Sequence, residues 1–316
     1  MATFLFNVLA VAAVLQAATA APPVPDSLAR LRTRVVEDST DGQAWLELGR
    51  ALERLAAAYH RHADTLADTV WASAVVDSAD EALARAAVLL TGTRAGDSAA
   101  VLRVAALAGR ALLAWEQRGV DAAAAAWERR ERVRLPPHLE ELGENLLRGC
   151  PRGGLLLAAG DLDGNASAYM RFVRGLRPDL LVITLPTWRR DAVLRARVAR
   201  DLRLGRAPRR AGDLAWLRVL VERRPVCASM AFEQPPDLGR AIRWRTRPLL
   251  WVAGPRANDD RVPPRDFVFA ALRLATDEHD TWVAPVVAVY RRAVRETPAL
   301  CEPLEVYGVE GRVGCR

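Results

Sequence analysis

Residues 153–185 read GGLLLAAGDLDGNASAYMRFVRGLRPDLLVITL. This stretch begins with an uninterrupted apolar run at residues 153–159, and a second apolar run follows at residues 180–185. Short continuous apolar runs are typical of strands that are buried on both faces. The residues between them, about 166–174, have a helical pattern that ends at Gly175. The segment therefore predicts a β-α-β unit with parallel strands and a right-handed crossover.

The remainder of residues 150–316 extends this unit. Residues 225–230 and 249–253 predict two more strands, and residues 215–223 and 282–294 predict helices. We therefore expect residues 150–316 to form a small Rossmann-like parallel sheet with flanking helices.

Residues 21–149 have a helical pattern instead. The octet WLELGRAL at residues 45–52 and the repeated GRAL at residues 109–112 resemble the first helix of a tetratricopeptide repeat, with second helices at residues 80–86 and 121–127. The resemblance covers about residues 40–135, and it implies that Gly49 and Gly109 lie where paired helices approach closely. The two glycines are 60 residues apart, so we expect an inserted helix at residues 56–78, and a capping helix at about 137–147. A generic helical bundle is the alternative, and the fold class is α followed by α/β.

The N-terminus predicts export. Residues 4–18 are uncharged and mostly apolar, and residues 18–20 read Ala-Thr-Ala, so residues 1–20 are expected to be a signal peptide. No basic residue precedes the run and Asn7 interrupts it, which leaves an uncleaved anchor as the alternative. No later segment is expected to span a membrane. All 45 basic residues are arginine and alanine is abundant, a composition that indicates a bacterium with a GC-rich genome. We therefore expect the exported chain to lie in the periplasm or the cell envelope of such a bacterium.

Export would place the four cysteines in an oxidising compartment. An even number of cysteines in an exported chain favours disulfides. We expect Cys301 to pair with Cys315 across a short glycine-rich tail, and Cys150 with Cys227. Buried free thiols are the alternative.

The net charge of +7 does not predict nucleic-acid binding. The arginines alternate with acidic residues, as in WERRER at residues 127–132, which gives a solvated helix face of mixed sign. The one purely basic cluster, at residues 206–210, has no aromatic side chains to stack bases.

A second resemblance lies in residues 160–254. The GDLD motif at 160–163, Tyr169 and the GLRPDL motif at 175–180 are similar to the soluble C-terminal region of bacterial multi-pass membrane proteins of unknown function related to protein O-mannosyltransferases. A later RPVC at 224–227 and the strand at 249–254 extend the similarity. Gly164 stands where that family has threonine, and this chain lacks the family's transmembrane body. The resemblance implies a fold, an envelope setting and association with envelope membrane proteins, but no activity.

Asp161 and Asp163 follow the first strand, at the carboxyl end where α/β sheets place their sites. Two carboxylates beside a glycine turn can bind Mg²⁺ or Ca²⁺ through oxygen. Alternatively, Asp163 or Asn165 caps the following helix. A third reading makes Asp161 a phosphatase nucleophile of the haloacid-dehalogenase type, with Thr184 on the second strand, although the chain lacks the lysine such enzymes use. The candidate ligand or metal-binding residues are Asp161, Asp163, Asn165, Tyr169, Arg177 and Thr184.

The sequence contains no P-loop, no G-x-S-x-G, no H-E-x-x-H and no G-x-G-x-x-G. We therefore expect an exported binding or scaffolding protein of the cell envelope, with a protein or peptide partner on its helical repeats. The alternative is a divalent-metal-dependent enzyme, a hydrolase or one acting in envelope glycan chemistry, that uses Asp161 and Asp163. The sequence leaves open whether the chain is an enzyme.

Overall fold

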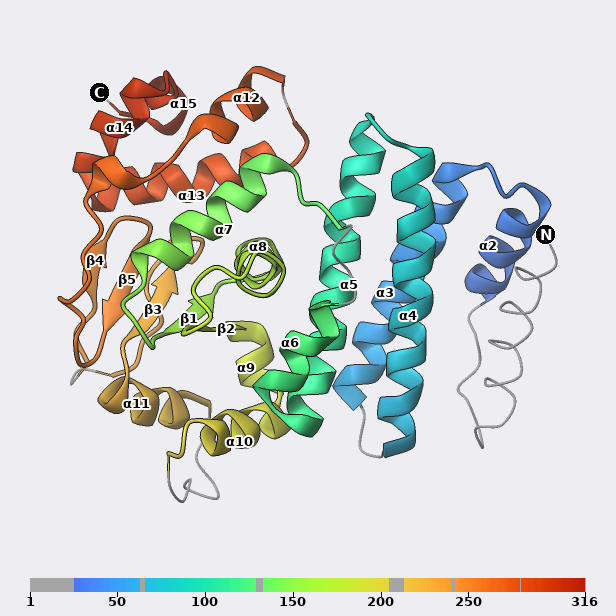
Figure 1. Ribbon diagram of the computed structural model, residues 1–316, viewed down its shortest axis with the longest axis horizontal. Helices are drawn as coiled ribbons and strands as arrows, with labels where there is room; N and C mark the ends of the chain where they lie inside the picture. The colour runs from blue at the N-terminus through green and yellow to red at the C-terminus, as the bar shows by residue number, and fades with distance from the viewer. Residues whose placement is uncertain are drawn as a thin grey trace.

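The computed structural model describes residues 26–62, 66–128, 133–204, 213–239, 242–278 and 280–315 (Figure 1). The signal peptide expected at residues 1–20 and the basic cluster at 206–210 lie outside the described residues. Helices dominate, and one five-stranded sheet lies in the C-terminal half. The expected class, a mixture of helical and α/β structure, is confirmed at that level.

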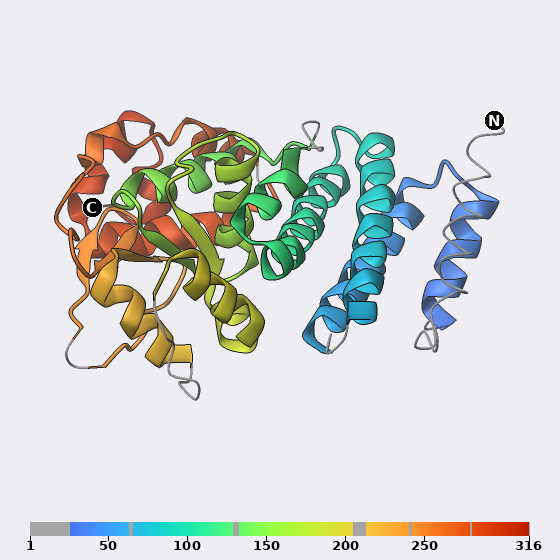
Figure 2. The ribbon, with the colours of Figure 1, turned by 60° about the horizontal axis from the view of Figure 1, so that its bottom comes forward.

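Among the residues that the structure describes, five helices form the N-terminal part (Figures 1 and 2). They are α2 (Asp26–Glu37), α3 (Gly42–His62), α4 (Leu66–Leu89), α5 (Arg94–Arg118) and α6 (Val120–Glu128). The separate helix expected at residues 56–78 is wrong, because these residues belong to the end of α3 and the start of α4. Residues 50–91 contain no glycine or proline, the two residues least favourable in a helix, and α3 and α4 each extend over more than 20 residues.

The two repeated glycines have different roles. A Cβ atom at Gly49 would lie 2.5 Å from Cγ of the fully buried Leu83, so α3 and α4 need glycine here to approach each other. A Cβ at Gly109 would meet nothing within 4 Å. The close approach predicted from the repeat is therefore confirmed at Gly49 and wrong at Gly109, where the helix surface is open.

Helix α5 connects the two parts of the protein. Its buried residues belong to both hydrophobic cores, the first built by α2–α5 and the second extending from α5 to the C-terminus. Among the described helices α5 is long and apolar enough to cross a membrane, contrary to expectation, but 56% of its most apolar stretch is buried within the fold. Helices α6 and α7 (Pro137–Gly149) pack in the second core, so the division into 21–149 and 150–316 stays a prediction.

The sheet has the strand order β2-β1-β3-β5-β4. Its strands are β1 (Leu155–Ala158), β2 (Leu181–Thr184), β3 (Val226–Ser229), β4 (Arg245–Arg247) and β5 (Leu250–Ala253). Strand β1 pairs in parallel with β2 and β3, which confirms the β-α-β unit. Strand β5 pairs antiparallel with β3, and β4 antiparallel with β5, so the expectation of a fully parallel sheet is wrong. The described part of residues 230–249 contains no helix, and a parallel return needs a long crossover that is usually helical.

Helices cover both faces of the sheet (Figures 1 and 2). Helices α7 and α13 lie on one side and α11 on the other. The elements not yet given are α8 (Asp161–Phe172), α9 (Leu185–Arg190), α10 (Ala192–Asp201), α11 (Asp213–Arg223), η1 (Pro264–Asp266), α12 (Ala270–Glu278), α13 (Val283–Glu296), η2 (Pro298–Leu300), α14 (Cys301–Val306) and α15 (Glu310–Val313). Helix α8 begins five residues earlier than the sequence indicates, at Asp161, and this early start governs the geometry of the site.

Two disulfides form in the C-terminal part. Cys150 and Cys227 join the end of α7 to β3, and Cys301 and Cys315 join α14 to the end of α15. Both predicted pairings are therefore present in the structure.

Glu141 of α7 makes the stability of this fold sensitive to pH. Its carboxylate is buried and accepts hydrogen bonds from the N–H groups of Ala271 and Leu272, at 2.8 and 3.0 Å, at the start of α12. Burial raises the pKa of Glu141 to about 7, from an ordinary value of 4.5. The folded protein therefore retains this proton to a higher pH than the unfolded chain does. The contribution of Glu141 to the free energy of unfolding falls as the pH rises from about 4.5 to about 7, by up to about 3 kcal/mol.

We predict that Glu141→Gln removes most of this pH dependence, because glutamine does not titrate. Urea unfolding of the wild type and the variant at pH 5 and pH 8 measures it. The wild type should lose stability between the two pH values by more than the variant does. Equal losses would show that Glu141 is not the titrating group.

Candidate functional site

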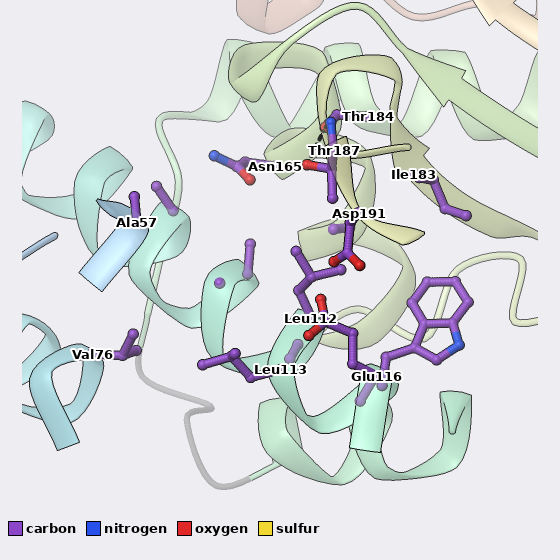
Figure 3. A pocket seen from close by; sticks show the side chains of 18 of the residues that line it. Ala57, Val76, Leu112, Leu113, Glu116, Asn165, Ile183, Thr184, Thr187 and Asp191 are labelled. Atoms are coloured by element: carbon purple, nitrogen blue, oxygen red, sulfur yellow. Dashed lines mark hydrogen bonds between the residues drawn. The ribbon is translucent and has the colours of Figure 1, made fainter. Parts of the chain in front are cut away.

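A groove of about 910 Å³ lies between the helical part, strand β2 and helix α8 (Figure 3). Helix α5 contributes the floor, α3 and α4 contribute Ala57 and Val76 on one side, and the starts of α8 and α10 contribute the other side. The floor contains Gly109 and Leu112, and at Gly109 no side chain fills the space above the helix. The groove is therefore built from both parts of the chain.

Three of the six predicted site residues line this groove. Asp161 is exposed, and Asn165 and Thr184 are half-buried. They come together because α8 packs closely on β2 at Gly164, where a Cβ atom would lie only 2.5 Å from Cγ2 of Thr184. The glycine that departs from the resembled motif is thus required by this close contact.

Asp163 does not face the groove. Its carboxylate turns back into the bend between β1 and α8, where Oδ2 accepts a hydrogen bond from the N–H of Ala159 at 2.8 Å and Oδ1 accepts one from Gly160 at 3.0 Å. The side chain also hydrogen-bonds with Ser229 at the end of β3. Burial, which leaves Asp163 1% exposed, raises the pKa of its carboxyl group above the ordinary value.

Gly160, and neither Asp163 nor Asn165, occupies the N-cap position of α8; Asp163 lies at the third position of the helix and closes the turn before it through the N–H groups of Ala159 and Gly160. Because α8 begins at Asp161, the two carboxylates lie about 200° apart around the helix and do not converge. Among the described residues, no group of three His, Cys, Asp or Glu side chains is arranged to bind a metal ion.

Thr184 ends β2 as predicted, but its hydroxyl group is engaged locally. It accepts a hydrogen bond from the N–H of Thr187 at 3.3 Å and donates one to Oγ1 of Thr187 at 2.8 Å, which caps the short helix α9. Thr187 also lines the groove. The two threonines thus give this wall a hydroxyl surface.

Tyr169 and Arg177 lie away from the groove and brace the fold. The hydroxyl of the buried Tyr169 donates to the carbonyl of Val133 at 2.8 Å. Arg177, at a φ of 51°, pairs with Asp179 at 2.9 Å and donates to the carbonyls of Leu147 and Cys150 at the end of α7. The Arg177 guanidinium lowers the pKa of Asp179 to about 2. The structure therefore does not bring Tyr169 and Arg177 together with Asp161.

Sequence reasoning missed the residues that α5 and the start of α10 supply. Glu116 lies on α5, and Asp191 caps α10 by accepting a hydrogen bond from the N–H of Leu194 at 2.8 Å. Their carboxylates point toward one another in Figure 3. The spacing of Gly109, Leu112 and Glu116 places all three on one face of α5, which was the available signal.

The two sequence resemblances bear on whether this chain is related to known protein families. Helices α3 and α4 have 21 and 24 residues, so this hairpin already exceeds the 34-residue period of a tetratricopeptide repeat. The resemblance to the O-mannosyltransferase-related region rests on the motifs at residues 160–180. Comparison with family models, curated proteins and solved structures finds no match to this chain.

Proposed function

We propose that this protein is a binding protein of the bacterial cell envelope that holds its partner in the groove between α5, β2 and α8. One observation carries the proposal: the groove is open, is lined from both parts of the chain and has an unfilled glycine at its floor. Its volume of about 910 Å³ is typical of a ligand site, and it lies beside the carboxyl end of β2.

The setting follows from separate observations. Two disulfides favour an oxidising compartment, and the sequence of residues 1–20 supports export to the periplasm or envelope. We take α3–α6 to be elongated, tetratricopeptide-like hairpins, because such helices present a concave face to a protein partner. The second resemblance suggests an envelope membrane protein as the partner.

No specific observation favours the alternative of a metal-dependent enzyme. Both oxygens of Asp163 accept backbone hydrogen bonds, so Asp161 would have to act without it. Titration of the mature chain with Mg²⁺, Mn²⁺ and Ca²⁺ tests this alternative. A thermal shift that Asp161→Ala abolishes would revive it.

The groove itself is tested by filling it. We predict that Gly109→Phe lowers retention of the partner from envelope extracts at least about ten-fold, because the ring occupies the floor. The fold should survive, since a Cβ at Gly109 meets nothing within 4 Å and glycine is a poor helix former. Quantitative affinity purification measures retention, and thermal unfolding checks the fold.

Gly311→Phe is the matched control. Gly311 also lies in a helix, α15, with nothing within 4 Å of its Cβ position, and it is outside the groove. This variant should retain the partner as the wild type does. Equal retention by both variants would contradict the proposed groove.

A further inference from the structure

A second, smaller hollow of about 390 Å³ lies at the other end of the parallel strands. Arg152 precedes β1 and Arg177 precedes β2, so both lie at the amino ends of these strands, whereas the groove lies beside the carboxyl end of β2. The ionisable residues that line the hollow are four arginines and two aspartates: Arg148, Arg152, Arg177, Arg261, Asp260 and Asp266. The hollow is therefore a separate candidate site with an excess of positive charge.

Two of the four arginines are held by the fold. Arg177 pairs through Nε and Nη2 with both carboxylate oxygens of Asp179 at 2.9 Å, and its Nη1 donates to two carbonyls at the end of α7. Arg148 pairs with Glu144, one turn earlier on α7. The charges of these two arginines are balanced within the protein, and the two side chains build the wall of the hollow.

The other two arginines keep hydrogen-bond donors available. The backbone N–H of Arg152 donates to Oδ2 of Asp260 at 3.3 Å, but its exposed guanidinium forms no hydrogen bond or ion pair with the described residues. Arg261 is also exposed, and its Nη2 donates to the neutral amide oxygen of Asn258 at 3.0 Å. A guanidinium group has five N–H donors, so each of these side chains can still bind an acceptor.

The loop that carries Arg261 is fixed from below by Arg247, which is 4% exposed. Its guanidinium donates to the carbonyls of Ala257, Asp259 and Gly149 at 2.6, 2.5 and 3.4 Å. Burial, and after it the positive charge of Arg261, lowers the pKa of Arg247. Two guanidinium groups thus lie near each other, an arrangement that a nearby anion would stabilise.

The two aspartates of the hollow have cations of their own. Oδ1 of Asp266 lies 3.9 Å from Nε of Arg265. Asp260 lies close enough to Arg247 for its negative charge to raise the pKa of that guanidinium, against the larger effect of burial. The positive charges of the two exposed arginines therefore remain available to a ligand.

We propose that this hollow binds the phosphate group of an anionic ligand, with Arg152 and Arg261 donating to its oxygens. Arginine suits phosphate because its planar fork can donate two parallel hydrogen bonds. A phosphate group has enough oxygens for two separate forks, whereas the two oxygens of one carboxylate fill a single fork. Val262 and Pro263 also line the hollow and leave an apolar surface for the carbon atoms of a phosphate ester.

The test measures binding of two phosphate sources to the full chain. Isothermal titration calorimetry with glycerol 3-phosphate tests a free phosphate ester, and co-sedimentation with phosphatidylglycerol vesicles tests a lipid headgroup. The double variant Arg152→Gln/Arg261→Gln should weaken binding of the source that fits by about ten-fold. The affinity of the wild type should also fall as sodium chloride rises from 50 to 300 mM. Thermal unfolding should show a stable variant, since both side chains are exposed.

Arg30→Gln/Arg32→Gln is the matched control. Both arginines lie on α2, outside the hollow, and this variant has the same net charge as the first. It should bind as the wild type does. Residues 1–20 are the same in every variant, so a difference in vesicle binding between the two double variants reports on the hollow.

The outcomes separate this inference from the proposed function. Binding of either source that only the Arg152/Arg261 variant loses supports the phosphate site, and the source that binds identifies the ligand as soluble or lipid. Absence of binding to both sources, or an equal loss in both double variants, would overturn it. Gly109→Phe should bind phosphate as the wild type does, because the groove is a different site.

Discussion

Replacing Cys150 and Cys227 together by alanine is expected to lower the free energy of unfolding by about 4.5 kcal/mol. The disulfide joins residues 77 positions apart, and a cross-link that closes so long a loop removes much of the entropy of the unfolded chain. Both cysteines are fully buried, so the loss of packing adds to the cost. Without the disulfide, α7 is no longer covalently tied to β3.

The other disulfide is the matched comparison. Cys301 and Cys315 are only 14 positions apart, so replacing both by alanine should cost about 3 kcal/mol. Urea unfolding without reductant, followed by circular dichroism, measures both variants. If the Cys301–Cys315 variant loses as much stability as the Cys150–Cys227 variant, the entropy of loop closure does not account for the stabilisation by the Cys150–Cys227 disulfide.

The strands were predictable where they are buried. Strands β1, β2, β3 and β5 are short apolar runs. Both faces of these strands are covered, so neither face needs polar side chains. Strand β4 was missed because it is an edge strand of sequence Arg-Thr-Arg with two exposed residues, a composition that blunts an edge and carries no apolar signal.

The direction of β5 was not readable from its own residues. A continuous apolar run looks the same whether its strand runs parallel or antiparallel to its neighbour. Only the connection to β3 can therefore indicate the direction of β5. Pro235 and Pro236 in that connection disfavour a crossover helix and therefore favour an antiparallel strand.

The candidate site was predictable only on the side that the β-α-β motif provides. Asp161 follows β1 and Thr184 ends the adjacent parallel strand β2, so their convergence follows from topology. Glu116 lies 45 positions before Asp161, and no local pattern relates the two residues. The contact of α5 with α8 and α10 is a tertiary one, set by how the second core forms around α5.

Replacing Asp163 by alanine is expected to lower the free energy of unfolding by about 4 kcal/mol. The substitution leaves the N–H groups of Ala159 and Gly160 without their acceptor in a half-buried turn, and each unsatisfied group costs about 1–3 kcal/mol. It also removes the hydrogen bond to Ser229 that ties the start of α8 to the end of β3. Asp163→Asn keeps one acceptor oxygen, so about half of the loss should remain.

Asp161→Ala is the matched control, two residues away with an exposed side chain. It loses only a favourable charge in the first turn of α8, so its cost should stay below about 1 kcal/mol. Urea unfolding and retention of the partner from envelope extracts, measured on both variants, separate the two roles. Asp163→Ala should lose stability, whereas Asp161→Ala should lose affinity and keep its stability. A stable Asp163→Ala variant that no longer binds its ligand would contradict this division, because it would return the Asp163 carboxylate to the groove as a partner of Asp161.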